Sequence, residues 1–125
     1  MGTWTAEELE RIGAADELVV TSARPDGTLR PFVTIWTVRV GDDVYIRSAY
    51  GPENAWFRRA KASGMGRVQA GGVTKDVTFE VPSEDVHGAL DAAYHAKYDR
   101  YGPRLVATVV GPDLVESTLR VVPRD

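Results

Sequence analysis

Cationic and hydroxyl side chains gather where a predicted strand leads into a predicted helix. Alternating apolar residues indicate a half-buried strand over 44–49, which Gly51-Pro52 ends, and Asn54 is a favourable N-cap for a helix over 55–62. The strand end contributes Arg47 and Ser48, and the helix carries Arg58, Arg59 and Lys61. Free backbone N–H groups, hydroxyls and cations in one place suit a phosphate. The alternative is that the helix cations form only a solvated face, and spacing alone favours this alternative.

Composition excludes several classes of function. The 125 residues fit a single domain spanning residues 1–125, and the formal net charge of −3 provides no general basic field for nucleic acid. The sequence contains no cysteine, so thiolate chemistry, disulfides and cysteine-bound metals are excluded. The first eleven residues are polar rather than signal-like, and no apolar run approaches the ~20 residues of a membrane helix. We therefore expect a soluble cytoplasmic protein without nucleic-acid or membrane partners.

The remaining elements predict an α+β fold or a small barrel. A capping box at Thr5 and Glu8, with Trp4 and Leu9 spaced as a hydrophobic staple, starts a short helix that ends at Gly13. Ser83 caps the longest helix, which ends before Gly102-Pro103. Strands are predicted over 17–22, 29–40, 44–49, 67–70, 73–81, 105–110 and 118–122. Because the connections between these strands are short, such as the hairpin turn at 71–72, we expect most neighbouring strands to be antiparallel.

The long predicted strand over 29–40 has apolar residues on both faces. A small barrel has only one interior, so the second face of this strand needs another cover. A twofold partner is the commonest cover, because one self-complementary patch then serves both copies. The side with Val33, Ile35 and Thr37 leads us to expect a homodimer.

Two stripes on the longest helix are each open to two interpretations. His87, Asp91 and His95 lie four residues apart, but they are spread over three turns of the helix, so a surface stripe is favoured over a metal site. Tyr94, Tyr98 and Tyr101 form a core edge or dimer packing, or alternatively an aromatic wall over a planar ring.

No catalytic or metal-binding residue can be assigned from motifs. Trp36 and Trp56 are core residues or, beside so many arginines, contacts of a flat anionic ligand. The sequence contains no phosphate-binding loop, nucleophile elbow or zinc-protease motif.

Six segments distributed along the chain carry a family resemblance. They are Leu29-Arg30-Pro31, residues 35–43, Tyr45-Ile46-Arg47-Ser48, Ala55-Trp56-Phe57-Arg58, residues 76–80 and residues 118–123. Together they resemble a bacterial family of small proteins, domain of unknown function 2255. At longer range the chain is similar to the FMN-binding split β-barrel superfamily, which includes pyridoxamine-phosphate oxidases, flavin reductases and deazaflavin-dependent nitroreductases.

The resemblance implies a split β-barrel with about six to seven strands and about three helices. It implies FMN or a deazaflavin coenzyme as cofactor, held in a groove between two barrels, and an oxidoreductase-like function of unknown substrate. The strand from Arg30 to Trp36 would pass the ring, residues 45–48 would meet the ribityl chain and phosphate, and residues 54–61 would clamp the phosphate.

The residues expected at this cofactor fall into three groups. Arg47, Ser48, Arg59 and Lys61 would bind the phosphate, Thr34, Trp36, Tyr50 and Trp56 would surround the ring, and Arg30 and Asn54 belong to the same segments. Asn54-Ala55-Trp56 is similar to the Pro-Ala-Trp of the deazaflavin branch. Glu53 departs from the pattern, because it places a carboxylate in the phosphate loop. It motivates the alternative of a non-catalytic ligand-binding or interaction module that kept the barrel and lost the cofactor.

Overall fold

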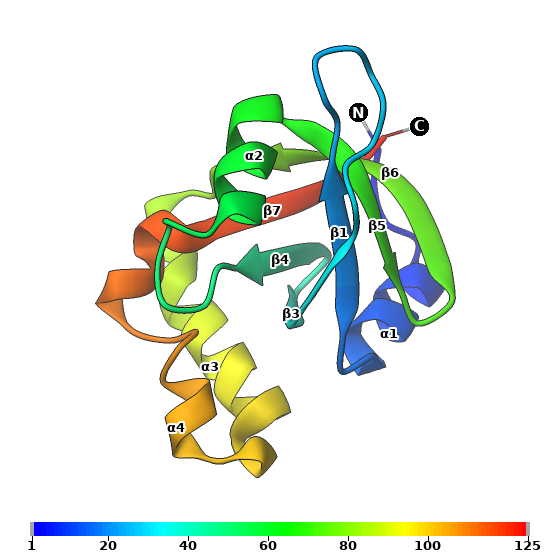
Figure 1. Cartoon of the computed structure of the whole chain (residues 1–125). Coiled ribbons are helices and arrows are strands. Elements are labelled where there is room, and N and C mark those ends of the chain that lie inside the picture. Colours follow the sequence, from blue (N-terminus) through cyan, green and yellow to red (C-terminus); the bar gives the residue numbers. More distant parts are fainter. Residues whose placement is uncertain (1, 125) are drawn as a thin grey trace.

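Seven antiparallel strands form one sheet that curls into a nearly closed barrel (Figure 1). The computed structural model describes residues 2–124. The strands are β1 (Leu18–Ser22), β2 (Val33–Ile35), β3 (Thr37–Val40), β4 (Asp43–Arg47), β5 (Met65–Ala70), β6 (Val73–Glu80) and β7 (Thr118–Pro123). Their order is β2-β1-β5-β6-β7-β4-β3, and every neighbouring pair is antiparallel. The predicted α+β split barrel is confirmed.

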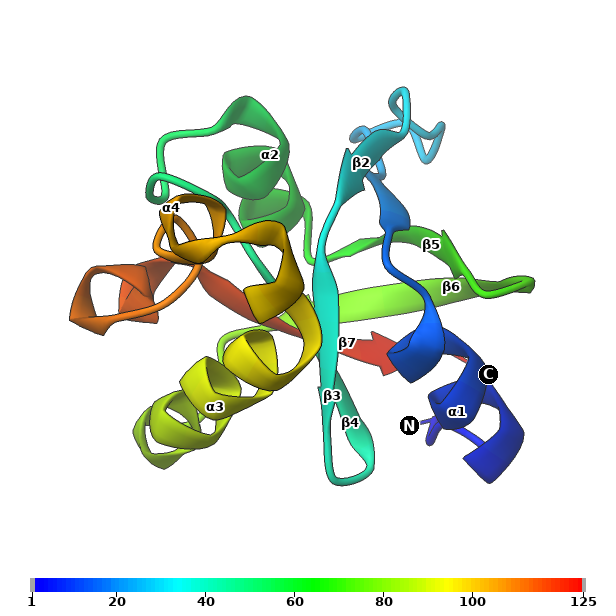
Figure 2. The ribbon, with the colours of Figure 1, turned by 90° about the horizontal axis from the view of Figure 1, so that it is seen from below.

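The two edge strands of the sheet, β2 and β3, follow one another in the chain and are separated only by Trp36. Both edges therefore meet at one point, where the sheet nearly closes on itself (Figure 2). The prediction of one uninterrupted strand over 29–40 is wrong. Leu29 forms only an isolated bridge with Ala23, whereas ladder pairing occurs over 33–35, which pairs with β1, and over 37–40, which pairs with β4. Because these partners lie at opposite ends of the strand order, the chain has to break its pairing between them.

Within residues 2–124, four α-helices and three short 3₁₀ segments surround the sheet. The helices are α1 (Ala6–Ala14), α2 (Ala55–Ser63), α3 (His87–Tyr98) and α4 (Pro103–Val106), and the 3₁₀ segments are Glu84–Val86, Asp99–Tyr101 and Pro112–Ser117. The strand predicted over 105–110 is wrong, because α4 and a turn take its place. Val106 and Val109 are buried against α3 three residues apart, which is a helical rather than an alternating spacing.

Helix α1 begins as its sequence predicts. The Thr5 hydroxyl accepts the backbone N–H of Glu8, and the Glu8 carboxylate accepts that of Thr5, so the capping box is confirmed. Trp4 and Leu9 are both buried, and the Trp4 indole donates to the Val121 carbonyl at 3.0 Å. The helix continues one residue beyond the predicted end at Gly13.

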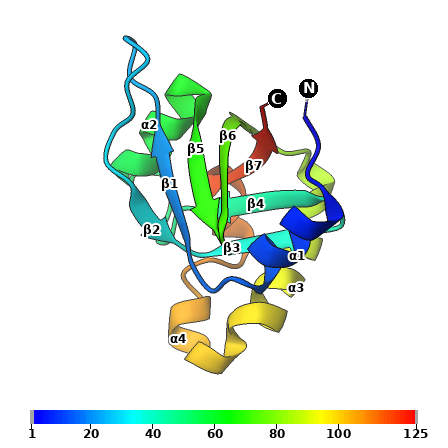
Figure 3. The ribbon, with the colours of Figure 1, turned by 90° about the vertical axis from the view of Figure 1, so that its right-hand side faces the viewer.

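Apolar residues form one core inside the barrel and another outside it. Side chains from α1 and α2, including Ile12, Phe57 and Ala60, fill the barrel interior. The outer core lies between the sheet and α3, whose place beside β3 and β4 is seen in Figure 3. In it, Leu90, Tyr94 and Tyr98 of α3 pack with Val38 and Tyr45. Strand β4 serves both cores by alternation, since Val44 and Ile46 face inward and Tyr45 faces α3. Arg47 lies two residues after Tyr45 and so shares its strand face, which places Arg47 against α3.

Candidate functional site

Three adjoining hollows run along one side of the molecule, between α2 and the segment that leads into β3. The ring cleft, about 400 Å³, is lined by Val33, Thr34, Ile35, Trp36, Arg47, Ala49, Tyr50, Asn54, Trp56, Leu105, Thr108 and Val109. The arginine groove, about 540 Å³, is lined by Ala23, Arg24, Pro25, Gly27, Arg30, Ala55, Arg58, Arg59, Ala62, Ser63 and Met65. A narrow connecting hollow shares Val33 and Trp56 with the ring cleft and Arg30 and Arg59 with the arginine groove.

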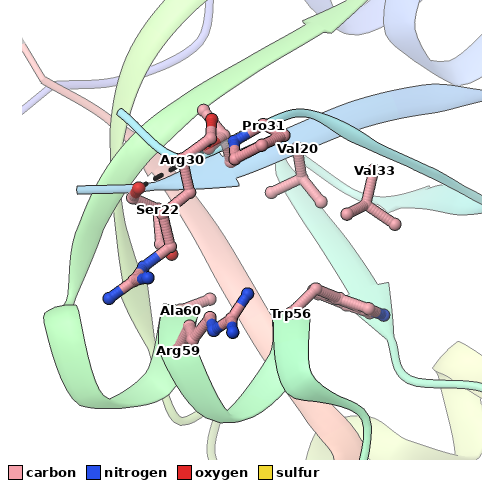
Figure 4. Close-up of a pocket in the computed structure, with 9 residues that line it drawn as sticks. Val20, Ser22, Arg30, Pro31, Val33, Trp56, Arg59 and Ala60 are labelled. Atoms are coloured by element: carbon pink, nitrogen blue, oxygen red, sulfur yellow. Dashed lines mark hydrogen bonds between the residues drawn. The ribbon is translucent and has the colours of Figure 1, made fainter. Parts of the chain in front are cut away.

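The arginine groove carries four cations and no carboxylate in its lining. Among residues 2–124, none of Arg24, Arg30, Arg58 and Arg59 forms an ion pair. Arg30 and Arg59 extend into the connecting hollow from opposite sides, one from the chain above β1 and the other from α2 (Figure 4). The Arg30 Nε is buried and lacks a hydrogen-bond partner within the described chain. A buried N–H without an acceptor is costly, so this atom is suited to an anionic ligand.

Helical spacing places the α2 arginines at the groove. Ala55, Arg58, Arg59, Ala62 and Ser63 line it at intervals of three and four residues, so they share one helix face. Phe57 and Ala60 lie on the buried face and anchor the helix in the barrel core. Lys61, predicted as a phosphate ligand, is exposed and lines none of the three hollows.

The start of α2 lies where the ring cleft and the arginine groove meet, since Asn54 lines the cleft and Ala55 lines the groove. Asn54 is the N-cap by position, but its side chain makes no capping bond. Instead its Nδ2 donates to the Ser48 Oγ and to the Ala49 carbonyl, each at 2.8 Å. The Ser48 hydroxyl is itself buried and donates to the Gly51 carbonyl at 2.6 Å. Both side chains therefore hold the loop before α2 in shape, and Ser48 is not free for a phosphate.

Arg47 is the largest departure from the predicted site. Its side chain is fully buried and its guanidinium is bonded to the protein on every nitrogen. Nε donates to the Thr118 hydroxyl (2.9 Å), Nη1 to Asp91 (2.5 Å) and to the Val109 carbonyl (2.9 Å), and Nη2 lies 3.1 Å from the His87 Nδ1. The geometry thus gives Arg47 a structural role behind the ring cleft rather than the predicted contact with a phosphate.

His87 and Asp91 belong to this buried network, and not to a surface stripe as predicted. Every guanidinium nitrogen is a donor, so the His87 Nδ1 facing Arg47 has to accept, and the imidazole is neutral. Burial, and next the Arg47 charge, lower the pKa of His87 below its ordinary value. His95 takes no part, because it bonds Asp99 at an exposed position. The sequence did contain a signal for this network. His87 and Asp91 lie four residues apart next to Leu90 and Tyr94, which are buried, and such a polar pair beside core residues indicates that a cation is buried against it.

Aromatic side chains form the walls of the ring cleft. The Trp36 ring stacks on Tyr98 with centroids 4.0 Å apart and an interplanar angle of 7°. Tyr98 and Tyr94 are buried in the outer core, so their interpretation as core residues is confirmed. Trp56 packs edge-on against Phe57. The Trp36 and Trp56 rings therefore flank an open space rather than filling it.

Thr34 and Tyr50 are polar residues of the ring cleft, whereas Glu53 lies outside it. Thr34 is exposed and lines the ring cleft, as does Tyr50, whose side chain is 85% exposed. Tyr50 has a φ of 68°, and its N–H donates to the Thr108 carbonyl at 3.2 Å. Non-glycine residues seldom adopt this conformation, and residues held in it cluster at active sites and ligand clamps. Glu53 is exposed and lines none of the hollows, so its carboxylate does not oppose a bound anion there.

Residues 2–124 show no group of three or more His, Asp or Glu side chains placed to hold a metal ion. Within the same range, no helix combines the length and the apolar character needed to cross a bilayer.

The barrel and its lateral cleft define a split β-barrel protein. The chain belongs to the family DUF2255, whose description is an uncharacterized protein conserved in bacteria and whose model matches residues 8–121. No curated protein matches the sequence.

Three solved structures share the fold at low sequence identity. A Listeria innocua protein provisionally assigned as a pyridoxamine 5′-phosphate oxidase has a TM-score of 0.65 at 12% identity, over 95% of this chain and 92% of that one. An F420-H2 dependent reductase has a TM-score of 0.62 at 16% identity, over 86% and 93% of the two chains. An FAD-binding protein of Mesorhizobium loti has a TM-score of 0.55 at 17% identity, over 98% and 92%.

Proposed function

We propose that the protein binds a flat anionic cofactor of the flavin or deazaflavin type and acts as an oxidoreductase-like protein. The single observation that carries the proposal is that a ring-sized aromatic cleft adjoins a groove lined by four arginines, none of which forms an ion pair within the described chain. A cofactor with a planar ring at one end and a phosphate at the other matches this distribution of chemistry. The neighbours named for F420 and FAD use the same fold and support this choice of ligand class.

The chain's own residues would bind and orient the cofactor. Trp36 and Trp56 would flank the ring, and Thr34 and Tyr50 lie beside it as polar contacts. Arg30, which has an unbonded buried Nε, would share the phosphate with Arg59. The cofactor would supply hydride or electron transfer, so the protein needs no acid or base of its own for that chemistry.

A non-catalytic binding module is the second candidate, and the ring-cleft lining favours it over any reaction in which the substrate has to exchange a proton with the protein. That lining contains no histidine, aspartate or glutamate, so no side chain there can exchange a proton with a substrate near neutral pH. Under this alternative the ligand binds but is not turned over. Reduction of a bound cofactor by NAD(P)H or by reduced deazaflavin, followed in its visible spectrum, separates the two functions.

The binding test uses two neighbouring cations on α2. FMN and the deazaflavin coenzyme are titrated separately into the wild type, Arg59→Ala and Lys61→Ala, with binding followed by visible absorbance. Arg59→Ala should weaken binding by roughly 1.5–3 kcal/mol, or about ten- to hundredfold, as for hydrogen bonds to charged groups. Lys61→Ala removes the same charge outside the groove and should leave affinity nearly unchanged. Equal losses in both variants, or no binding by the wild type, would contradict the proposal.

A further inference from the structure

A separate groove lies between α1, β3 and α3 and shares no lining residue with the three hollows described above. Its volume is about 490 Å³, and its lining is Leu9, Glu10, Gly13, Val38, Arg39, Ala93, Ala96 and Lys97. Most of these side chains are small or apolar, so the polar chemistry of the groove comes from one amine, one guanidinium and one carboxylate.

The amine is the Lys97 Nζ, which is half-buried and held in place. It donates to the Thr37 carbonyl at 2.7 Å and lies 5.2 Å from the centre of the Tyr98 ring. Within residues 2–124 it forms no ion pair with a carboxylate. Asp16 and Arg100 are the charged groups that influence it most, and they act in opposite directions. Burial dominates and lowers the pKa of Lys97 to about 8. The neutral, nucleophilic fraction of this amine near physiological pH is therefore larger than that of an ordinary lysine, although the protonated form still predominates.

The guanidinium belongs to Arg39, on the strand beside Lys97. Its Nε donates to the Gly41 carbonyl at 2.8 Å, and its aliphatic part packs against Gly13, where an added Cβ would lie 3.5 Å from the Arg39 Cδ. Within the described chain its terminal nitrogens form no ion pair, and Glu10 is the single acid in the groove lining. Lys97 and Arg39 thus line the same groove, one with an amine and the other with a guanidinium that can bind a phosphate.

We propose that Lys97 is an acylation site for small acyl phosphates, with Arg39 holding the phosphate. The Lys97 nitrogen attacks the acyl carbon, an amide C–N bond forms, and the carbon–oxygen bond to the phosphate breaks. The amine loses one proton to solvent, and inorganic phosphate leaves with the electron pair of the broken bond. The apolar floor formed by Val38 and Ala93 accommodates a short acyl chain.

The test compares lysines within one chain. The full-length protein is incubated with acetyl phosphate near neutral pH, and acetylation of Lys61, Lys75 and Lys97 is followed over time by peptide mass spectrometry. Lys61 is exposed, and Lys75 is paired with Glu8 at 3.3 Å, so both serve as internal controls. Lys97 should react about tenfold faster than Lys61, because its larger neutral fraction outweighs its partial burial. Acetylation of Lys97 at or below the rate of Lys61 would overturn the proposal.

Arg39→Ala tests the phosphate-holding part independently. This variant should lower Lys97 acetylation by acetyl phosphate severalfold, while acetic anhydride, which carries no phosphate, should modify Lys97 at the wild-type rate. An equal loss with both reagents would show that the substitution disturbs Lys97 itself, and no loss with either would remove Arg39 from the proposal. Circular dichroism of the variant verifies that it is folded.

Discussion

At the scale of single residues, Arg47 illustrates how a buried cation is accommodated. It connects β4 to α3, to β7 and to the turn at Val109 through hydrogen bonds from all three guanidinium nitrogens. Tyr94 lies beneath it, with the guanidinium carbon 5.6 Å from the ring centre. A charge removed from water is tolerated only with such complete pairing. Arg47 therefore fixes the position of the outer core against the barrel, directly behind the ring cleft.

The pairing of Arg47 with His87 predicts a pH dependence of stability. The folded protein lowers the pKa of His87, so the unfolded chain binds a proton more readily than the folded one. The contribution of His87 is fully present above the unfolded pKa of about 6.5 and is lost as the pH falls from there toward the folded value. His87→Asn offers a non-titrating acceptor to Arg47, so its stability should fall less than that of the wild type over this range. Urea unfolding at a series of pH values measures the difference.

The other histidine provides the matched control. His95 is exposed and lies outside the Arg47 network, so His95→Asn leaves the Arg47–His87 contact intact and should keep the loss of stability that this contact causes at low pH. If His87→Asn and the wild type lose stability in parallel as the pH falls, His87 is not the titrating group.

Single residues were predictable where local chemistry decides them. The capping box at Thr5 and Glu8 depends only on neighbours in the chain, and the structure confirms it. The burial of Arg47 depends on partners 40 to 71 positions away, and no local pattern specifies them. Lys61 was misplaced for another reason. All three cations of α2 look alike in sequence, and only the docking of Phe57 into the barrel determines which of them face the groove.

At the scale of elements, strand pairing decided what periodicity could not. The alternation over 29–40 is real, but the two ends of this stretch pair with strands at opposite ends of the sheet order, so Trp36 interrupts them. The apolar run at 105–110 is equally compatible with a strand or a helical turn. Gly102 and Pro103 start a helical turn there, with Gly102 at a φ of 100° and Pro103 at its first position.

The close approach of β5 to β1 predicts a severe effect of one small substitution. A Cβ at Gly66 would lie 1.9 Å from the Thr21 carbonyl oxygen and 3.0 Å from the Ser22 Cα, and backbone atoms cannot move aside as a side chain can. Gly66→Ala should therefore destabilise the protein by roughly 3 kcal/mol, at the upper end of the usual cost of overpacking. Urea unfolding measures the change.

Gly88→Ala serves as the matched control, because no atom lies within 4 Å of the added Cβ in α3. It should stabilise the protein by about 0.5–1 kcal/mol through helix propensity. Similar effects of the two substitutions would show that the β1–β5 contact is looser than described.

At the scale of the whole molecule, the reason for expecting a dimer changes. The side of 29–40 that was thought to need a cover is largely covered, because Val33 and Ile35 pack on the barrel core and Thr37 is buried. The apolar residues left exposed near the ring cleft are instead Tyr50 and Leu105, which line it, and Phe32, which precedes the lining residue Val33. An apolar patch around a cleft is a common site of association.

We accordingly expect a homodimer that meets at the ring cleft. Light scattering at micromolar concentration should give twice the chain mass of 13.7 kDa. Leu105→Asp, which places a charge in the patch, should weaken association at least about tenfold, as burial of an unpaired charge would. Val115→Asp changes another exposed apolar residue outside the cleft lining and should leave the dimer intact. A monomer mass for the wild type, or equal effects of both substitutions, would count against this interface.

The position of β7 in the sheet determines when the barrel can be completed during synthesis. β7 lies between β6 and β4, so Thr118 pairs with Arg47 and Val122 with Thr78. Until residues 118–123 leave the ribosome, both neighbouring strands have an unpaired edge, and such edges invite association with other chains. Pairing β7 with β4 also closes the long stretch of chain between them, and such a non-local contact makes barrel formation slow relative to that of a helical bundle of the same size. The nascent chain therefore remains incompletely paired until its last strand has been made.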